Sequence, residues 1–332
     1  MKNFLVLSIL STQLFSSQSP FFDQLPAEIY DFGVEQVGSV IYFVGGRGSS
    51  NWTAVDTVFT YDLITNQYSS LPSMSINRYD PAVLFNGNNR IYVVGGRNVS
   101  WETEYSVEEF DLGTNQWSTI LDGQDGNNIG DGYDGDSYKF FTVCNSKIYS
   151  VSTNRTSWDL SLFETSNGLV WSIYDSGWTP SQGPTLVSDN NNVYMIGGSY
   201  GDYPNHFISF NQNSQIYTVL QNHNLIGTNF LVFHREGKIY KFGGSDGSTS
   251  DNLEIYDIEQ NSWQQHYYPS YNGKDHSIVV DDETGLYYLF NSDYHLDQSS
   301  NGLYFYADTL PHITPITDRE MFQNDTLQIQ LS

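Results

Sequence analysis

The stretch Ile91-Tyr-Val-Val-Gly-Gly96 decides the fold, because the chain repeats it. Close copies begin at Ile41, Val193 and Ile239, and two copies that keep the apolar residues but lack the glycines begin at Ile148 and Leu286. Successive copies start 50, 57, 45, 46 and 47 residues apart. Such a period indicates a repeat architecture, in which each repeat is one structural unit.

The repeated stretch has a physical meaning of its own. Four β-branched, aromatic or apolar residues in a row are typical of a strand that is buried on both faces. The two glycines that follow are expected to end the strand, because glycine adopts positive φ and allows another backbone to come close. The sequence therefore predicts one buried strand in each repeat.

A second motif follows the first five copies: an aromatic residue, often an Asp, a polar turn and a second aromatic residue. The two aromatics are seven residues apart in four repeats and eight apart in one. Two strands joined by a tight turn would bring such a pair together where neighbouring sheets pack. The pairs are Tyr61 and Tyr68, Phe110 and Trp117, Phe163 and Trp171, Phe210 and Tyr217, and Tyr256 and Trp263.

Together, the Gly-Gly, Tyr-Asp and Trp signatures resemble the kelch repeat, a four-stranded antiparallel blade of a β-propeller. The resemblance covers residues 20–310 and implies an all-β, six-bladed ring. The sixth repeat lacks the second aromatic, so we predict that an N-terminal strand at residues 22–26 completes its sheet and closes the ring. The alternative gives that place to residues 309–315.

Strand alternation predicts where the loops lie. If the strands of a blade are named a to d from the centre outward, the b–c loops and the d–a links between blades share one face, which we call the b–c face. The b–c loops are long and unlike one another, whereas the a–b turns are short. Long variable loops on a rigid scaffold commonly carry function. We therefore expect the binding site on the b–c face.

Residues 1–19 differ from the rest of the chain. Lys2, a short apolar run and then Ser and Gln are typical of a secretory signal peptide, and the run is shorter than the ~20 residues of a membrane span. We predict a signal peptide at 1–19, the propeller at 20–310 and a C-terminal tail at 311–332, in a protein that is secreted or lies in the endomembrane lumen. The alternative is a cytosolic protein with a disordered tail, for which an adaptor-like role would lead.

Four Asn-x-Ser/Thr sequons would be glycan acceptors in a secreted chain. Three of them fall in the b–c loops of the first three repeats, which leaves the face over the last three repeats open. The sequons are at Asn51, Asn98, Asn154 and Asn324.

Composition narrows the partners. The net charge of −25 makes nucleic acid and anionic membranes poor partners and favours a basic one. The single cysteine, Cys144, allows no internal disulfide and is expected to be a buried apolar residue. We expect a monomer without a cofactor or a membrane span.

Aromatic residues in the b–c loops suggest a ligand-binding patch. Aromatic rings with nearby Asp and Asn hold sugars by stacking and hydrogen bonding. Trp52 and Trp101 lie close to sequons and are expected to pack locally. The predicted patch is Tyr200, Tyr203, Asp246, Asp251, Tyr294 and His295.

Signals for chemistry are weak. All seven histidines lie between His206 and His312 without the close spacing of a zinc site, so we predict no metal. The Asp- and Gly-rich link at 122–136 is a solvated loop or, alternatively, a calcium site in a structural component. Arg78 is expected at the start of the inner strand of the second repeat, where an arginine resembles a structural anchor of kelch repeats.

Two functions remain open at this stage. The first is a secreted, glycosylated module that binds a protein or a glycan through the b–c face. The second is a carbohydrate-acting enzyme that resembles the sialic acid mutarotases of the family, for which Arg235 beside Glu236 is the one candidate pair. Arg, Glu and His converging on the central channel would favour the enzyme, whereas an apolar lining would favour the binding module.

Overall fold

In the part of the chain that the computed structural model describes, the regular secondary structure consists of β-strands, and no residue there is helical. The described residues are 25–26, 29–48, 52–121, 141–153, 160–165, 172–175, 184–197, 205–224, 228–245, 252–267, 276–280, 286–291 and 305–309.

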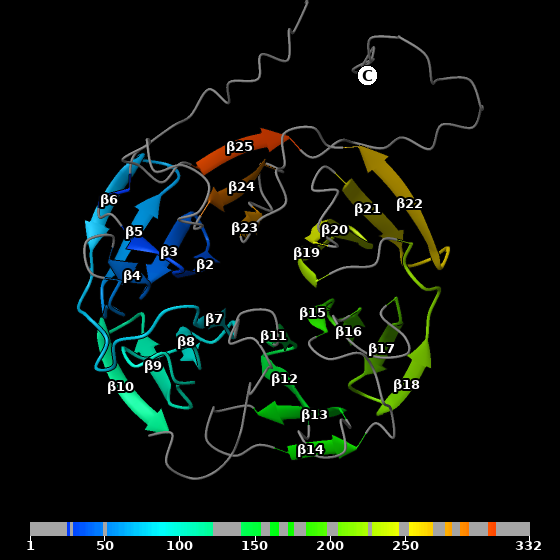
Figure 1. The fold of residues 1–332 in the computed structure, drawn as a ribbon, viewed down its shortest axis with the longest axis horizontal. Helices are drawn as coiled ribbons and strands as arrows, with labels where there is room; N and C mark the ends of the chain where they lie inside the picture. Colours follow the sequence, from blue (N-terminus) through cyan, green and yellow to red (C-terminus); the bar gives the residue numbers. More distant parts are fainter. Residues whose placement is uncertain are drawn as a thin grey trace, which may run out of the picture.

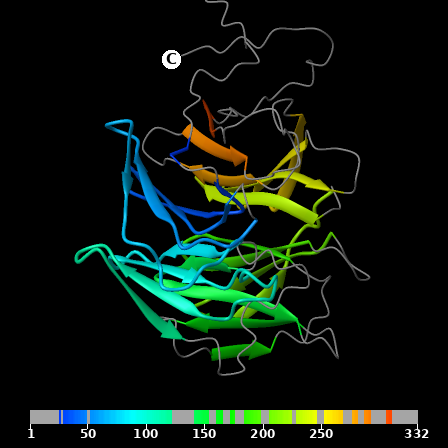
Figure 2. The same cartoon turned by 60° about the vertical axis from the view of Figure 1, so that its left-hand side comes forward.

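The sheets form a propeller-like ring around a common centre (Figure 1). Five of them have four antiparallel strands in chain order from the centre outward, and the described part of the last has three. Figure 2, in which the first two sheets come forward, shows that their strands twist, as those of β-sheets normally do. The all-β prediction is confirmed for the described residues.

The first three sheets run from residue 33 to residue 175. The first contains β2 (Gly33–Val37), β3 (Val40–Val44), β5 (Val58–Asp62) and β6 (Gln67–Ser70). The second contains β7 (Ala82–Phe85), β8 (Arg90–Val94), β9 (Val107–Asp111) and β10 (Gln116–Leu121). The third contains β11 (Phe141–Cys144), β12 (Lys147–Thr153), β13 (Leu160–Thr165) and β14 (Ser172–Asp175).

The remaining sheets continue the ring. The fourth contains β15 (Thr185–Ser188), β16 (Asn192–Ile196), β17 (Phe207–Asn211) and β18 (Ile216–Val219). The fifth contains β19 (Thr228–Arg235), β20 (Lys238–Ser245), β21 (Asn252–Asp257) and β22 (Ser262–Tyr267). The sixth contains β23 (His276–Val280), β24 (Leu286–Asn291) and β25 (Phe305–Thr309). A separate pair of strands, β1 (Ile29–Tyr30) and β4 (Arg47–Gly48), was not predicted.

The repeated stretch forms the second strand of each sheet. In the first five sheets most of its described side chains are buried, as predicted. The glycines behave as expected in the first two sheets: Gly46 and Gly96 have φ of 109° and 91°. A Cβ on Gly46 would lie 2.6 Å from the carbonyl oxygen of Tyr30. The expectation is wrong for the fifth sheet, where β20 runs through Gly243 and Gly244 to Ser245.

The aromatic pairs face each other across the third and fourth strands of four sheets. Their ring centroids are 4.7 to 5.1 Å apart. The exception is Phe163, which lies opposite Ile173, while Trp171 is outside the described residues. In the turn between the strands, Asp62 Oδ1 accepts hydrogen bonds from the N–H groups of Ile64 and Thr65, and Asn66 takes a φ of 55°. This explains why Asp and Asn recur between the aromatics.

The core lies between neighbouring sheets. One cluster joins Val44 and Val58 of the first sheet to Val83 and Val93 of the second, and others join the later sheets in the same way. The indole N–H of Trp117 also donates to the carbonyl of Pro72, in the link that leads into its sheet, at 2.8 Å. Each sheet therefore buries its faces mainly against its neighbours, as repeat architectures do.

Candidate functional site

The link between the first two sheets joins the b–c loops on either side of it. Arg78 N–H donates to the carbonyl of Val55, and the carbonyl of Arg78 accepts from Gly46 N–H, at 3.1 and 2.9 Å. Tyr79 and Arg97 exchange a pair of backbone hydrogen bonds at 2.8 and 3.0 Å. Loops and link therefore share one face over these two sheets, as strand alternation predicts.

A cluster on this face surrounds the guanidinium of Arg47, and we call it the Arg47 cluster. The guanidinium carbon lies 4.7 Å from the ring centroid of Tyr79, 5.1 Å from Trp101 and 5.4 Å from Trp52. The carboxylate of Asp31 forms an ion pair with the same guanidinium. Cation–π attraction and the ion pair together fix the arginine among the three rings.

Both tryptophans of the Arg47 cluster have a left-handed backbone. The φ of Trp52 is 57° and that of Trp101 is 66°. A bulky residue pays about 1–3 kcal/mol for this conformation, so the surrounding structure must hold it there. Trp101 is nevertheless 56% exposed. The expectation of local packing therefore describes only part of its surface, and the rest is open.

The sequon at Asn98 forms the turn that presents Trp101. Its side-chain oxygen accepts hydrogen bonds from the N–H groups of Ser100 and Glu102 at 2.8 and 3.2 Å. Its carbonyl accepts from Trp101 N–H at 3.1 Å. The sequons at Asn51, Asn154 and Asn324 are outside the described residues, and glycosylation of all four stays a prediction.

The predicted ligand-binding patch is also untested. All of its members lie outside the described residues: Tyr200, Tyr203, Asp246, Asp251, Tyr294 and His295.

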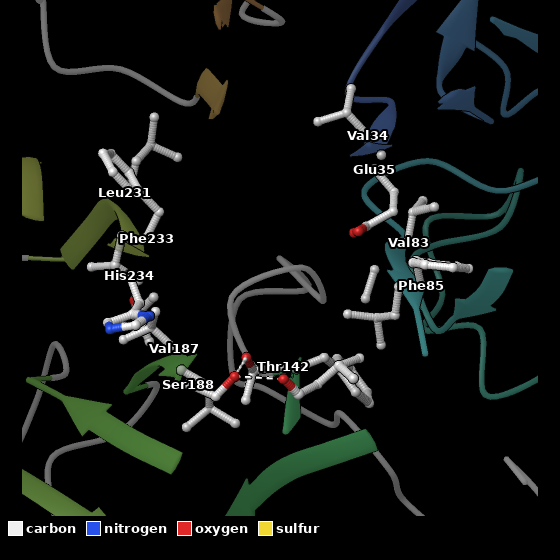
Figure 3. A pocket seen from close by; sticks show the side chains of 18 of the residues that line it. Val34, Glu35, Val83, Phe85, Thr142, Val187, Ser188, Leu231, Phe233 and His234 are labelled. Carbon is white, nitrogen blue, oxygen red and sulfur yellow. Dashed lines mark hydrogen bonds between the residues drawn. The ribbon is translucent and has the colours of Figure 1, made fainter. Parts of the chain in front are cut away.

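A cavity of about 530 Å³ occupies the centre of the ring (Figure 3). Its described lining comes from the innermost strands of the first five sheets and from Pro81. Most of these side chains are apolar or small, and Glu35 and His234 are the ionisable ones among them. The hydroxyl of Ser188 donates to the carbonyl of Val143 at 2.5 Å and accepts from Thr142 at 3.1 Å, so both hydroxyls have partners.

Glu35 extends from β2 into this cavity (Figure 3). Its side chain keeps some surface open to the cavity, although protein surrounds it. Burial raises the pKa of Glu35 from 4.5 to about 8, although a hydrogen bond from the Phe85 N–H lowers the pKa by a smaller amount. Sequence reasoning missed this residue. The available signal was a carboxylate inside a stretch predicted to be an inner strand.

The family model of the kelch motif matches residues 29–75, 82–120 and 228–265. These ranges coincide with the first, second and fifth sheets. This is a kelch-repeat protein. The matched repeats are those that keep both the glycine pair and the Asp between their aromatics. No curated protein matches this chain.

Two matched kelch repeats bury an ion pair on equivalent glutamates of their third strands. Arg78, in the link before the second sheet, lies 2.9 Å from Glu108 on β9, and Lys241 on β20 lies 2.8 Å from Glu254 on β21, all with fully buried side chains. Each glutamate also accepts a backbone N–H from the link before its sheet, that of Ser75 at 2.7 Å and of Asn224 at 2.9 Å. The two glutamates therefore tie each link to the sheet that follows it.

The anchoring role expected for Arg78 from the kelch resemblance is thus present, with one correction. Arg78 lies in the link and not at the start of the inner strand, since β7 begins at Ala82. Its guanidinium also donates to the carbonyls of Gly95 and Ser106 at 3.1 and 3.0 Å. Sequence reasoning missed Glu108, Lys241 and Glu254, although a lysine within a doubly buried strand was a usable signal.

The other candidates for chemistry in the kelch ring are structural where they can be described. Cys144 is fully buried and donates to the carbonyl of Asp189 at 3.2 Å, and burial raises the pKa of its thiol to about 12. Arg235 and Glu236 contact each other at 3.5 Å, but neither lines the cavity.

Among the described residues, no three His, Cys, Asp or Glu side chains form a group that could hold a metal ion. The Asp-rich link at 122–136 is outside this part. Within the same part of the chain, no helix is long and apolar enough to cross a membrane.

Proposed function

We propose that this kelch protein is a non-catalytic binding module that recognises a protein or a glycan through its b–c face. Kelch propellers generally mediate protein interactions, and the analogy with this family supports binding as the class of function. The Arg47 cluster carries the proposal for this face. It combines a held cation, three aromatic rings and a tryptophan that is 56% exposed. Rigid, partly exposed aromatics of this kind are typical anchors of recognition surfaces.

The cavity lining argues against the enzyme as the leading function. A mutarotase-like site needs Arg and Glu directed at the same ligand. Among the described lining residues there is no arginine, and Glu35 is the only acid. A mostly apolar lining fits the binding module better.

We further propose that the protein is secreted and glycosylated and that the propeller has six blades. The signal-like residues 1–19 and the four sequons support secretion. Leu25 supports closure by the N-terminal strand, because it packs in one buried cluster with Val279 of the sixth sheet and Phe43 of the first.

Intact-mass analysis of protein from a secreting eukaryotic host tests the secretory part. Loss of about 19 N-terminal residues together with mass that a glycosidase removes is expected. An unprocessed chain without glycan would refute secretion and send the search to cytosolic partners.

Screening on arrays of glycans and extracellular proteins tests the binding face. For a ligand found with the wild type, Trp101→Ala removes the Arg47 cluster's exposed ring, and Tyr203→Ala removes part of the predicted patch. We expect one of them to weaken binding about tenfold or more, which locates the site. Val219→Ala is the matched control, because Val219 is exposed on the outer strand β18. Full affinity in both Trp101→Ala and Tyr203→Ala would refute the b–c face.

A further inference from the structure

The repeats provide an internal comparison for every residue of the central cavity. In each sheet, one inner-strand residue lies opposite the tyrosine of the repeated stretch. In the second to fifth sheets this residue is Leu84, Thr142, Val187 and Phe233, whereas in the first sheet it is Glu35, opposite Tyr42. The repeat fold itself therefore needs no acid at this position.

The carboxyl group has a cost in this setting. Transferring a carboxylate into apolar surroundings is unfavourable unless it is paired. No lysine or arginine is among the described residues that line the cavity. A group that departs from the pattern of its repeat, at a cost in free energy, is expected at functional sites.

The chemistry around Glu35 selects the kind of ligand. A carboxylate favours a positive charge, and Phe85, Phe141 and Phe233 contribute to a lining that suits alkyl groups and ammonium ions. A calcium ion requires about 6–8 oxygen ligands, which one carboxylate in an apolar lining does not supply. The volume lies within the range of roughly 300–1,000 Å³ that is usual for small-molecule sites.

We propose that the central cavity binds a small organic cation, an amine or a quaternary ammonium compound, with Glu35 as its counter-charge. The cavity lies on the inner strands (Figure 3), and none of its described lining residues belongs to the Arg47 cluster. It does not depend on the function proposed for the b–c face.

The protonation of Glu35 predicts how the affinity for the cation depends on pH. Its pKa of about 8 means that the carboxyl is mostly neutral at neutral pH and must lose its proton to pair with a cation. The described titratable groups that face it are Tyr42 on β3 and His234 across the cavity. A neutral tyrosine does not repel the cation, and a histidine at the position of His234 repels it only when protonated. Neither group therefore reverses the effect of Glu35, and the affinity for the cation is expected to rise with pH.

Calorimetric titration of the whole chain with choline tests the site, with 3,3-dimethylbutan-1-ol as the uncharged compound of the same shape. Choline keeps its charge at every pH. We expect choline to bind better than the alcohol, with an affinity that rises ~30-fold from about pH 6.5 to about pH 9 as Glu35 ionises. Equal affinities of the two compounds, an affinity independent of pH, or no binding at about pH 9 would each overturn the proposal.

Substitution of Glu35 tests whether this carboxylate is the counter-charge of the bound cation. Glu35→Gln keeps the shape of the side chain and should lower choline affinity at the higher pH at least tenfold, without changing affinity for the alcohol. Glu259→Gln, on an exposed turn, is the matched control and should bind choline as the wild type does. Unchanged choline binding in Glu35→Gln would overturn the proposal. If Glu35→Gln does not fold, the wild-type titrations decide alone.

Discussion

Arg78, Lys241 and Glu35 each bring an ionisable group into the interior, but their partners differ. Burial lowers the pKa of both cations, and the charges of Glu108 and Glu254 act against this shift. Glu35 receives only the Phe85 N–H as a cause that favours its ionised form. Paired charges in a buried position are a structural device, whereas a carboxyl without a countercharge stores a proton that can be exchanged.

Replacing Glu35 with Gln is expected to change how stability depends on pH. The folded-state pKa of about 8 lies above the ordinary value of 4.5, so the folded protein holds a proton that the unfolded chain releases. The wild type's free energy of unfolding therefore loses this contribution as pH rises from about 4.5 to about 8. Urea unfolding measures the free energy of unfolding of both proteins. The difference, Glu35→Gln minus wild type, should increase by about 2–4 kcal/mol between about pH 5 and about pH 9.

The control for the pH measurement is Glu259→Gln, whose side chain is exposed. It should keep the pH dependence of the wild type. If Glu35→Gln also keeps that dependence, the raised pKa of Glu35 is contradicted.

At the scale of the strand, the close backbone approach at Gly46, where the second strand ends, can be tested against Gly38, a turn glycine of the same sheet. Gly46 and Gly38 both have positive φ, but a Cβ on Gly38 would meet nothing within 4 Å, whereas one on Gly46 would lie 2.6 Å from a backbone oxygen. We expect Gly38→Ala to cost about 1 kcal/mol, for backbone strain alone, and Gly46→Ala about 3 kcal/mol or more. Urea unfolding measures both, and equal losses would show that the close approach at Gly46 is unimportant.

The buried pair of the fifth sheet has a natural apolar counterpart in the fourth. Lys241 lies opposite Glu254, and at the equivalent position Met195 lies opposite Ile208. Glu254→Gln removes the carboxylate charge that pairs with the buried Lys241 ammonium and should cost about 3–5 kcal/mol. The double variant Lys241→Met, Glu254→Ile should recover most of this loss, with a remainder because Asn224 N–H loses its acceptor.

Thermal or urea unfolding of the single and double variants decides the point. A double variant as unstable as Glu254→Gln would mean that the fifth sheet depends on the ion pair itself and not on filling its space.

Features that repeat could be predicted from the sequence, and features that combine different repeats could not. The buried strands and four aromatic pairs follow from local periodicity, because each is complete within one sheet. The Arg47 cluster takes Arg47 and Trp52 from one repeat and Tyr79 and Trp101 from the next, so only the register of the ring brings them together. The position of Glu35 toward the cavity likewise depends on which face of β2 turns inward.

At the scale of the whole molecule, the ring depends on how its ends meet. The described part of the sixth sheet has three strands, with β25 at its outer edge. An exposed outer edge would pair with other chains unless a strand or loop covers it. Leu25 is 6% exposed and packs with Val279, Ile29 and Phe32, so the chain enters the ring between its sixth and first sheets. This entry point favours residues 22–26 over residues 309–315 as the covering strand.

Truncation distinguishes the two ways of closing the ring. A chain without residues 1–19 should unfold at the same temperature as the full chain. If residues 22–26 cover the edge, a chain without residues 1–26 loses that cover and the packing of Leu25 in the cluster that contains Val279. Its Tm should then fall by about 2–4 °C for each kcal/mol lost, and it should self-associate through the edge of β25. Scanning calorimetry and light scattering measure these effects, and a chain without residues 311–332 is the control. If that control loses stability while the chain without residues 1–26 does not, the C-terminal segment closes the ring instead.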